Sequence, residues 1–391
     1  MSPFTGEVIV AGHICLDLIP QLHGPANVRA GHLAKIGPAL LSTGGAVANT
    51  GGALHKLGVS VRLMGKIGDD AFGNIVLDLL RRSGIRLADD MLIGRGETTS
   101  YSIVISPPNQ DRTFWHCTGA NDTFCADDVP YDRLVDARFF HFGYPPIMAR
   151  MFADGGAELA QMLSRVRERG LATGLDFAQP DPESDAGKID WAALLQRVLP
   201  HVDVVFPSVE ELLFMLDRPA FDASRINSKI VGLKTVQRLA DRLLGMGAAV
   251  AAIKLGEFGM YVRSTDDASR LDDFCRKLSL KLADWLDREL YVPCFRASKV
   301  VGTTGSGDCT IGGFIASIMT GGDVFAAARS AVAVGAFSVE TADATGGIRP
   351  WAEVQSRLTA GWDSLPNRLP LDGRPHQLRS DGIYVFERNR S

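Results

Sequence analysis

Short apolar runs that suit β-strands alternate with helical patterns along most of this 391-residue chain. In the pattern over residues 152–168, for example, Leu159, Met162, Leu163 and Val166 recur at helical spacing. Parallel strands need a crossover connection, so this alternation predicts an α/β fold, with a mainly parallel sheet and helices on both faces. Strands are expected at Val8 to Ala11, Val59 to Met64, Ala137 to Phe142, Thr173 to Phe177, Val202 to Phe206, Ala249 to Leu255 and Tyr261 to Arg263.

Two segments, residues 16–41 and 97–117, break this alternation. In the second segment, apolar residues such as Tyr101, Ile103 and Ile105 alternate with serines. An apolar and polar alternation of this kind is typical of strands with one exposed face. Both segments are therefore predicted to form a small sheet apart from the main one.

The C-terminal third contains an insertion and a tail within what we expect to be one domain over residues 1–391. Residues 264–295 have apolar side chains at helical spacing between charged ones, which predicts an amphipathic helix packed on the core. Trp351 to Leu358 has one short helical pattern. The polar residues 359–391 are expected to form a tail over the surface or a neighbouring subunit.

The composition, with 46% hydrophobic residues and a net charge of −4, indicates a globular protein with a substantial core. No basic run suggests a nucleic acid partner, and neither a leader nor a membrane span is recognisable, so a cytoplasmic location is expected. The six cysteines show no zinc-site spacing and are expected to be reduced.

The run from Gly302 to Cys309 combines small residues with a carboxylate, between a strand-like and a helix-like segment. The backbone N–H groups of Gly305, Ser306 and Gly307 would lie at a helix start, where they can bind a negative oxygen. Asp308 would lie beside them as a general base for phosphoryl transfer to an alcohol. Alternatively, the motif is only a turn with Asp308 capping the next helix.

Three motifs occur in an order that resembles the PfkB, or ribokinase-like, carbohydrate kinase family: Gly44-Gly45 with Asn49, Gly68-Asp69-Asp70 with Gly73, and Thr304-Gly305-Ser306-Gly307-Asp308. The match extends from about Val8 to about Gly347. The resemblance implies a ribokinase-like three-layer sandwich, with residues 16–41 and 97–117 as a β-lid that often pairs between subunits. It also implies ATP, Mg²⁺ and a sugar or sugar acid, phosphorylated at a primary hydroxyl. A homodimer through the lid is accordingly expected.

On the acceptor side, the resemblance assigns sugar contacts to Asp17, Gly44, Gly45 and Asn49. A carboxylate can accept both hydroxyl hydrogens of a diol, and glycine lets the backbone approach the substrate closely. Asp17 is otherwise only a turn former at a strand end, and Asn49 is otherwise, or additionally, a helix cap.

On the nucleotide side, the resemblance points to Ser208, Glu211, Lys254, Gly256 and Gly259. Glu211 would organise water around Mg²⁺, or it is simply an exposed helix residue. Lys254 would pair with phosphate, or it only ends a strand.

Two residues depart from the family pattern. Ser208 stands where the family usually has Asn, although its hydroxyl could still hold water or phosphate. Gly302 stands where relatives have an Asp that helps to bind a monovalent cation, so activation by potassium is left open.

Other residues near these motifs have weaker interpretations. Tyr101, Arg112, His116 and Asn121, on or just after the lid, either touch substrate or pack the lid. His116 has no partner histidine at ligand spacing and is not predicted to bind a metal. Cys309 is expected to be a packing residue rather than a nucleophile.

Three other functions compete with the sugar kinase. A nucleoside kinase would use the same centre and add aromatic stacking, for which the lid offers Phe114 and Trp115. A sugar-binding sensor without turnover would account for the departures at Ser208 and Gly302. A dinucleotide-binding dehydrogenase is disfavoured, because Gly12-His13-Ile14-Cys15 lacks the glycine pattern that follows the first strand in such enzymes.

Overall fold

The computed structural model describes residues 2–24, 30–107, 112–227 and 231–387, with the side chains of residues 225–227 left out. Residues 25–29 and 108–111 of the expected lid and the last four residues of the expected tail lie outside this description. No helix in the described part of the chain is both long and apolar enough to cross a membrane.

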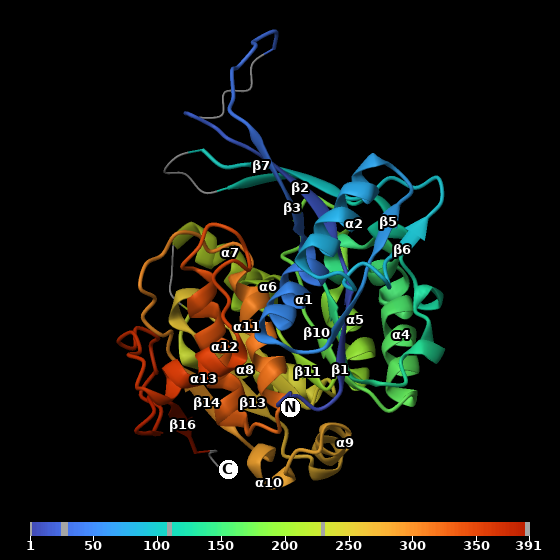
Figure 1. The fold of residues 1–391 in the computed structure, drawn as a ribbon. Helices are drawn as coiled ribbons and strands as arrows, with labels where there is room; N and C mark the ends of the chain where they lie inside the picture. Colours follow the sequence, from blue (N-terminus) through green and yellow to red (C-terminus); the bar gives the residue numbers. More distant parts are fainter. Residues whose placement is uncertain (1, 25–29, 108–111, 228–230, 388–391) are drawn as a thin grey trace.

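The described strands form a ten-stranded main sheet, which is parallel on one side and antiparallel on the other (Figure 1). Neighbouring strands from β4 to β12 are parallel, and those from β12 to β15 are antiparallel. In spatial order the strands are β15 (His376–Leu378), β16 (Tyr384–Phe386), β14 (Glu289–Val292), β13 (Met260–Ser264), β12 (Val250–Lys254), β11 (Val204–Val205), β10 (Ala172–Leu175), β9 (Ala137–Gly143), β1 (Glu7–Gly12) and β4 (Val61–Met64).

Helices cover both faces of this sheet, which gives the predicted three-layer arrangement. In β1, Val8 and Val10 belong to one apolar core, whereas Ile9 and Ala11 belong to the other, because successive side chains of a strand point to opposite faces. The first core contains α1 (Gly45–Leu57), α2 (Ala71–Ser83), α9 (Ala268–Leu278), α10 (Leu282–Trp285), α11 (Ser306–Ile318), α12 (Val324–Ser338) and α13 (Trp351–Thr359). The second contains α3 (Ala149–Phe152), α4 (Ala157–Glu168), α5 (Trp191–Val198), α6 (Val209–Leu216), α7 (Arg218–Asn227) and α8 (Leu233–Gly245).

A separate four-stranded sheet projects from the body, as predicted for the lid (Figure 1). Its strands, in spatial order, are β3 (Ala39–Gly44), β2 (Cys15–Pro20), β7 (Tyr101–Ile105) and β8 (Thr113–Cys117). Because β2 follows β1 after two residues, the lid begins directly at the carboxyl end of a core strand. A smaller pair is formed by β5 (Lys66–Gly68) and β6 (Leu92–Gly94).

Three local expectations differ from the structure. The helix expected over residues 152–168 begins only at Ala157, because Asp154, Gly155 and Gly156 have positive φ angles of 49°, 62° and 75° and interrupt it. Within residues 264–295, α9 is the amphipathic helix, but β14 adds a strand to the main sheet. Within the expected tail, β16 pairs with β14 and extends the same sheet.

Candidate active site

Asp308 lies in the first turn of α11, and its side chain is buried between this helix and α1. Gly305 is the residue before the helix and has a φ of 72°, a backbone conformation that glycine adopts readily. The Asp308 carboxylate accepts hydrogen bonds from Asn49 Nδ2 at 2.9 Å and Thr50 Oγ1 at 3.4 Å. The helix start therefore places a carboxylate inside the protein rather than on an exposed turn.

The Tyr144 hydroxyl donates to both oxygens of the same carboxylate, at 2.9 and 2.8 Å. Tyr144 directly follows β9 and has a φ of 71°, which is uncommon for a residue with a side chain. Tyr144 was not among the site residues predicted from the sequence. Its position at the carboxyl end of a parallel strand was the available signal, because ligand sites in α/β sheets gather at that edge.

Lys254, at the end of β12, is the cation nearest to a group of buried carboxylates. Its Nζ lies 2.6 Å from Asp176 Oδ1. Burial raises the pKa of Asp308, Asp176 and Glu211, with Asp176 reaching about 8, and Lys254 opposes this rise. These acids in turn raise the pKa of Lys254, which keeps its charge. Lys254 thus ends a strand and also balances part of an acidic site.

The first turn of α11 faces Lys254. A Cβ placed on Gly307 would lie 3.5 Å from Lys254 Cδ, so glycine lets the helix start approach this side chain. The first N–H groups of a helix have no intrahelical partner. The Ser306 N–H donates to the Thr303 carbonyl at 3.2 Å, which engages one of the three expected anion donors.

A cavity of about 550 Å³ opens beside this helix start. Five of the residues predicted from the sequence line it: Lys254, Gly256, Gly259, Ser306 and Gly307. Its other side is largely apolar, with Phe295, Val300, Val332, Ala336, Val339 and Leu365 among the lining residues. An apolar surface next to a helix N-terminus fits a nucleotide, whose base is flat and whose phosphates are anionic.

Ser208 and Glu211 hydrogen bond to each other at the start of α6. Neither residue is among those that line this cavity. Ser208 Oγ accepts from the Glu211 N–H at 3.2 Å, and the Ser208 N–H donates to Glu211 Oε2 at 2.6 Å. This reciprocal pair is a capping box. Glu211 is buried, so the alternative that it is an exposed helix residue is wrong.

On the acceptor side, Asp17 and the two glycines lie against one another. A Cβ on Gly44 would lie 2.3 Å from Asp17 Oδ2, and one on Gly45 would lie 2.5 Å from His13 Nδ1, so side chains are excluded at both positions. Asp17 lies within β2 rather than in a turn, and burial raises its pKa. Asn49 lies inside α1 and binds Asp308, so the capping alternative for Asn49 is wrong.

One residue of the lid, Arg112, interacts with both the start of α11 and the acceptor side of the site. Arg112 Nη1 donates to Thr304 Oγ1, next to the helix start, and the Arg112 charge also lowers the pKa of Asp17.

Asn121 hydrogen bonds to both the N–H and the carbonyl of Ile14, which fixes the loop that carries His13. Tyr101 packs its ring against Phe72 of α2. His116 lies with His13, so the expectation that it has no partner histidine is wrong.

Residues that could hold a metal ion or a nucleotide are present. Asp176 Oδ2 is buried without a hydrogen-bond partner among the described residues, and Glu211 lies near the same lysine. Carboxylate oxygens of this kind suit a hydrated Mg²⁺. Cys309 is buried and donates to the Ala344 carbonyl at 3.1 Å, and burial raises its pKa, which is consistent with a packing residue.

Comparison with known proteins decides the family. Residues 5–351 match the pfkB family of carbohydrate kinases. The chain belongs to this family. As a pfkB carbohydrate kinase, it shares 21% identity over 75% of its length with an uncharacterized sugar kinase of Archaeoglobus fulgidus, of which the match covers 96%. With a nucleoside kinase of Methanothermobacter thermautotrophicus it shares 25% identity over 80% of its length and 82% of that protein.

The fold of this pfkB kinase is also that of a known structure. A ribokinase of Arabidopsis thaliana complexed with ribose and ATP superposes with a TM-score of 0.68 at 16% identity, over 90% of this chain and 98% of the other. The enzyme is therefore a carbohydrate kinase of the pfkB family with the ribokinase fold. The order of glycine and acidic motifs had predicted the family correctly.

Proposed function

We propose that this kinase transfers the γ-phosphoryl group of ATP to a primary hydroxyl of a small sugar or sugar acid. The observation that carries the proposal is the position of Asp308. Its buried carboxylate is bound by Asn49 on the acceptor side, and it lies in the helix turn that borders the apolar cavity. At such a junction an acceptor hydroxyl and a nucleotide phosphate can meet.

In this proposal Asp308 acts as the general base. The acceptor hydroxyl replaces the Tyr144 hydroxyl at the carboxylate, and Asp308 takes its proton as the oxygen attacks phosphorus. The N–H groups of Gly305 and Gly307 hold the charge that develops on the phosphoryl oxygens, and that of Ser306 would join them only by leaving the Thr303 carbonyl. Each well-placed donor is worth about 3 kcal/mol in the barrier.

Asp17 and Asn49 orient the hydroxyl groups of the acceptor, while Gly44 and Gly45 leave room for it. Arg112 favours an acceptor that carries a carboxylate. Its guanidinium lies between Asp17 and Thr304, close to where the acceptor would be, and could bind that carboxylate in a bidentate manner.

ATP and Mg²⁺ are the implied cofactors. Bound in the cavity, ATP would supply the phosphoryl group, and Mg²⁺ would neutralise its charge. Lys254, Gly256 and Gly259 would contact the nucleotide, and Ser208 with Glu211 would organise water for the metal ion. Gly302 offers no carboxylate to a monovalent cation, so we expect turnover without a requirement for potassium.

One observation favours a nucleoside as the second candidate. In β8, Phe114 and His116 share a face because they are two residues apart, and His116 faces the site. Phe114 is 51% exposed and could stack on a base. Trp115 lies on the opposite face and does not support stacking.

We also propose that the lid pairs between two copies of the chain. Large apolar side chains are exposed on it, namely Leu33, Ile36, Leu40, Leu41 and Trp115. So many exposed large apolar side chains on one small sheet are unusual for the surface of a monomeric protein and are typical of an interface. The projection of the lid from the body leaves this surface accessible (Figure 1).

The decisive experiment measures ADP release with Mg²⁺-ATP and a panel of hexoses, pentoses, sugar acids and nucleosides, for wild type and Asp308→Asn. Release with one acceptor class, lost in the variant, is expected. If no acceptor gives release while some raise the melting temperature, the protein is a sugar-binding sensor and the kinase proposal fails.

A further inference from the structure

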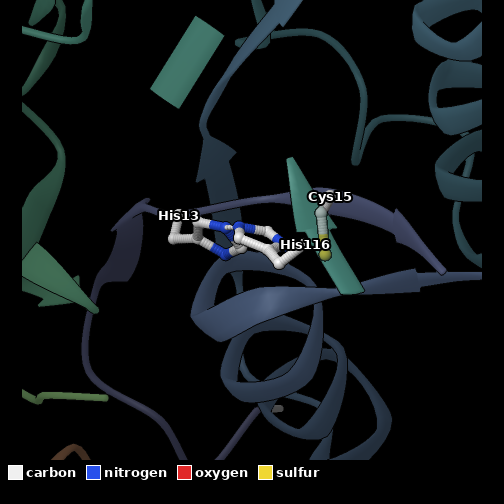
Figure 2. A group of neighbouring side chains, drawn as sticks. All are labelled: His13, Cys15 and His116. Atoms are coloured by element: carbon white, nitrogen blue, oxygen red, sulfur yellow. Dashed lines mark hydrogen bonds between the residues drawn. The ribbon is translucent and has the colours of Figure 1, made fainter. Parts of the chain in front are cut away.

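His13, Cys15 and His116 come together where the lid meets the core (Figure 2). His13 lies between β1 and β2, Cys15 is the first residue of β2, and His116 lies on lid strand β8. One ligating atom of each side chain lies within 4.8 Å of the other two. Because His116 is more than a hundred positions away in the sequence, motif spacing could not reveal this cluster.

The spacing of the two imidazoles is that of two ligands on one ion. His13 Nε2 and His116 Nε2 are 3.2 Å apart. Two nitrogens bound tetrahedrally to zinc, each at about 2.0–2.1 Å, lie about 3.3 Å from each other. These two nitrogens share a hydrogen bond, so the histidine that carries the proton must move it to its Nδ1 before both can bind one ion. The Cys15 thiol would turn toward them from Asp17 Oδ1, to which it donates at 3.4 Å.

The donor atoms suit a zinc-class ion better than Mg²⁺. Two imidazole nitrogens and one sulfur are the ligands that Zn²⁺ prefers, whereas Mg²⁺ prefers oxygen. Ser102 Oγ lies 2.9 Å from His116 Nδ1 and fixes the orientation of that ring.

We propose that His13, Cys15 and His116 bind one Zn²⁺-class ion, which joins lid strand β8 to the core. On binding, the Cys15 S–H bond is broken, its proton passes to the buffer, and a sulfur–metal bond forms. The fourth position is open to water. The cluster adjoins the proposed acceptor contacts, because Cys15 Sγ donates to Asp17 Oδ1 at 3.4 Å and His13 lies against Gly45. Metal binding can nevertheless be tested without ATP, Mg²⁺ or an acceptor.

The test uses the full-length protein, first treated with a chelator and then titrated with Zn²⁺ by calorimetry. We expect one ion per chain in wild type. His13→Gln, Cys15→Ser and His116→Gln should each abolish tight binding, and Ser102→Ala should weaken it by about 10- to 100-fold. Cys117→Ser is the matched control, because Cys117 neighbours His116 on β8 but is not part of the cluster. It should bind like wild type.

Spectroscopy identifies the ligands directly in the wild-type protein. Its result therefore does not depend on whether a ligand variant folds. Co²⁺ should give a thiolate-to-metal charge-transfer band in wild type and Cys117→Ser but not in Cys15→Ser. X-ray absorption of the Zn²⁺ protein should show nitrogen neighbours and one sulfur. A shell of oxygen alone, no binding in wild type, or binding that survives all three ligand substitutions would overturn the proposal.

Discussion

The hydroxyl of Tyr144 donates hydrogen bonds to both oxygens of the Asp308 carboxylate, at 2.9 and 2.8 Å. The two residues are 164 positions apart in the sequence, one directly after β9 and the other in the first turn of α11. Burial raises the pKa of Asp308, and the hydrogen bonds that its carboxylate accepts from Tyr144, Asn49 and Thr50 lower it again. Tyr144 therefore lowers the pKa of the proposed base, and its hydroxyl also takes the position at the carboxylate that the acceptor hydroxyl would need.

Replacing Tyr144 by Phe should move the acid limb of the kcat/KM profile to higher pH. A base acts in its deprotonated form, so the rate rises as pH passes its pKa, and loss of a donor to the carboxylate raises that pKa. A hydrogen bond to a charged group is worth about 1.5–3 kcal/mol, which corresponds to a shift of about 1–2 pH units. ADP release measured across pH checks this.

The control for Tyr144→Phe is Tyr131→Phe. The Tyr131 hydroxyl donates to the Ala126 carbonyl, away from the active site, and its loss should leave the profile unchanged. An acid limb at the same pH in wild type and Tyr144→Phe would contradict the tuning role of Tyr144.

Because the pKa of Asp176 is already raised to about 8 and this carboxyl is mostly protonated at neutral pH, Lys254→Met should destabilise the protein little at pH 7 and by up to about 3–5 kcal/mol above pH 8, where it leaves a buried charge without its cation. It should also raise the pKa of Asp308, since Lys254 is the leading influence that lowers it. The free energy of unfolding, measured in urea, gives the first effect. The acid limb of the activity profile gives the second.

Adding Asp176→Asn to Lys254→Met should recover much of the lost stability, because the buried carboxylate no longer needs a partner. Together with the single variants, this completes a double-mutant cycle. If the two losses simply add, Lys254 and Asp176 do not stabilise each other, and the explanation of the Lys254→Met effect is wrong.

The sequence predicted the α/β class, the lid and the family because periodicity and short glycine motifs are local signals. Asp308 and Asn49 were placed in one site through such motifs. Asp176 was missed even though its strand was expected, because nothing local distinguishes a buried ion pair from a turn carboxylate. Its partner Lys254 is 78 positions away.

The β14 and β16 strands were missed for a related reason. Glu289–Val292 and Tyr384–Phe386 are short, and each becomes a strand only by pairing across the fold. The two form hydrogen bonds over a separation of more than ninety residues. Local propensity is too weak to predict such pairing.

The protein should be a dimer in solution through its lid, and Leu40→Glu or Trp115→Glu should make it monomeric. Leu40 is 60% exposed and Trp115 is 50% exposed, so a charge at either position disfavours burial in an interface without disturbing the core. Light scattering after size exclusion measures the mass. Ile85→Glu, at an 83% exposed position outside the lid, is the control and should remain dimeric. A monomeric wild type would reject the dimer.

Ser208→Ala should lower the free energy of unfolding by about 1 kcal/mol, because the Ser208 side chain caps α6 through the Glu211 N–H. Ser208→Asn should leave stability close to that of wild type, since Asn caps a helix as well as Ser does. Urea unfolding of the three proteins measures both effects. Equal stability of Ser208→Ala and wild type would show that the capping box adds nothing to the fold.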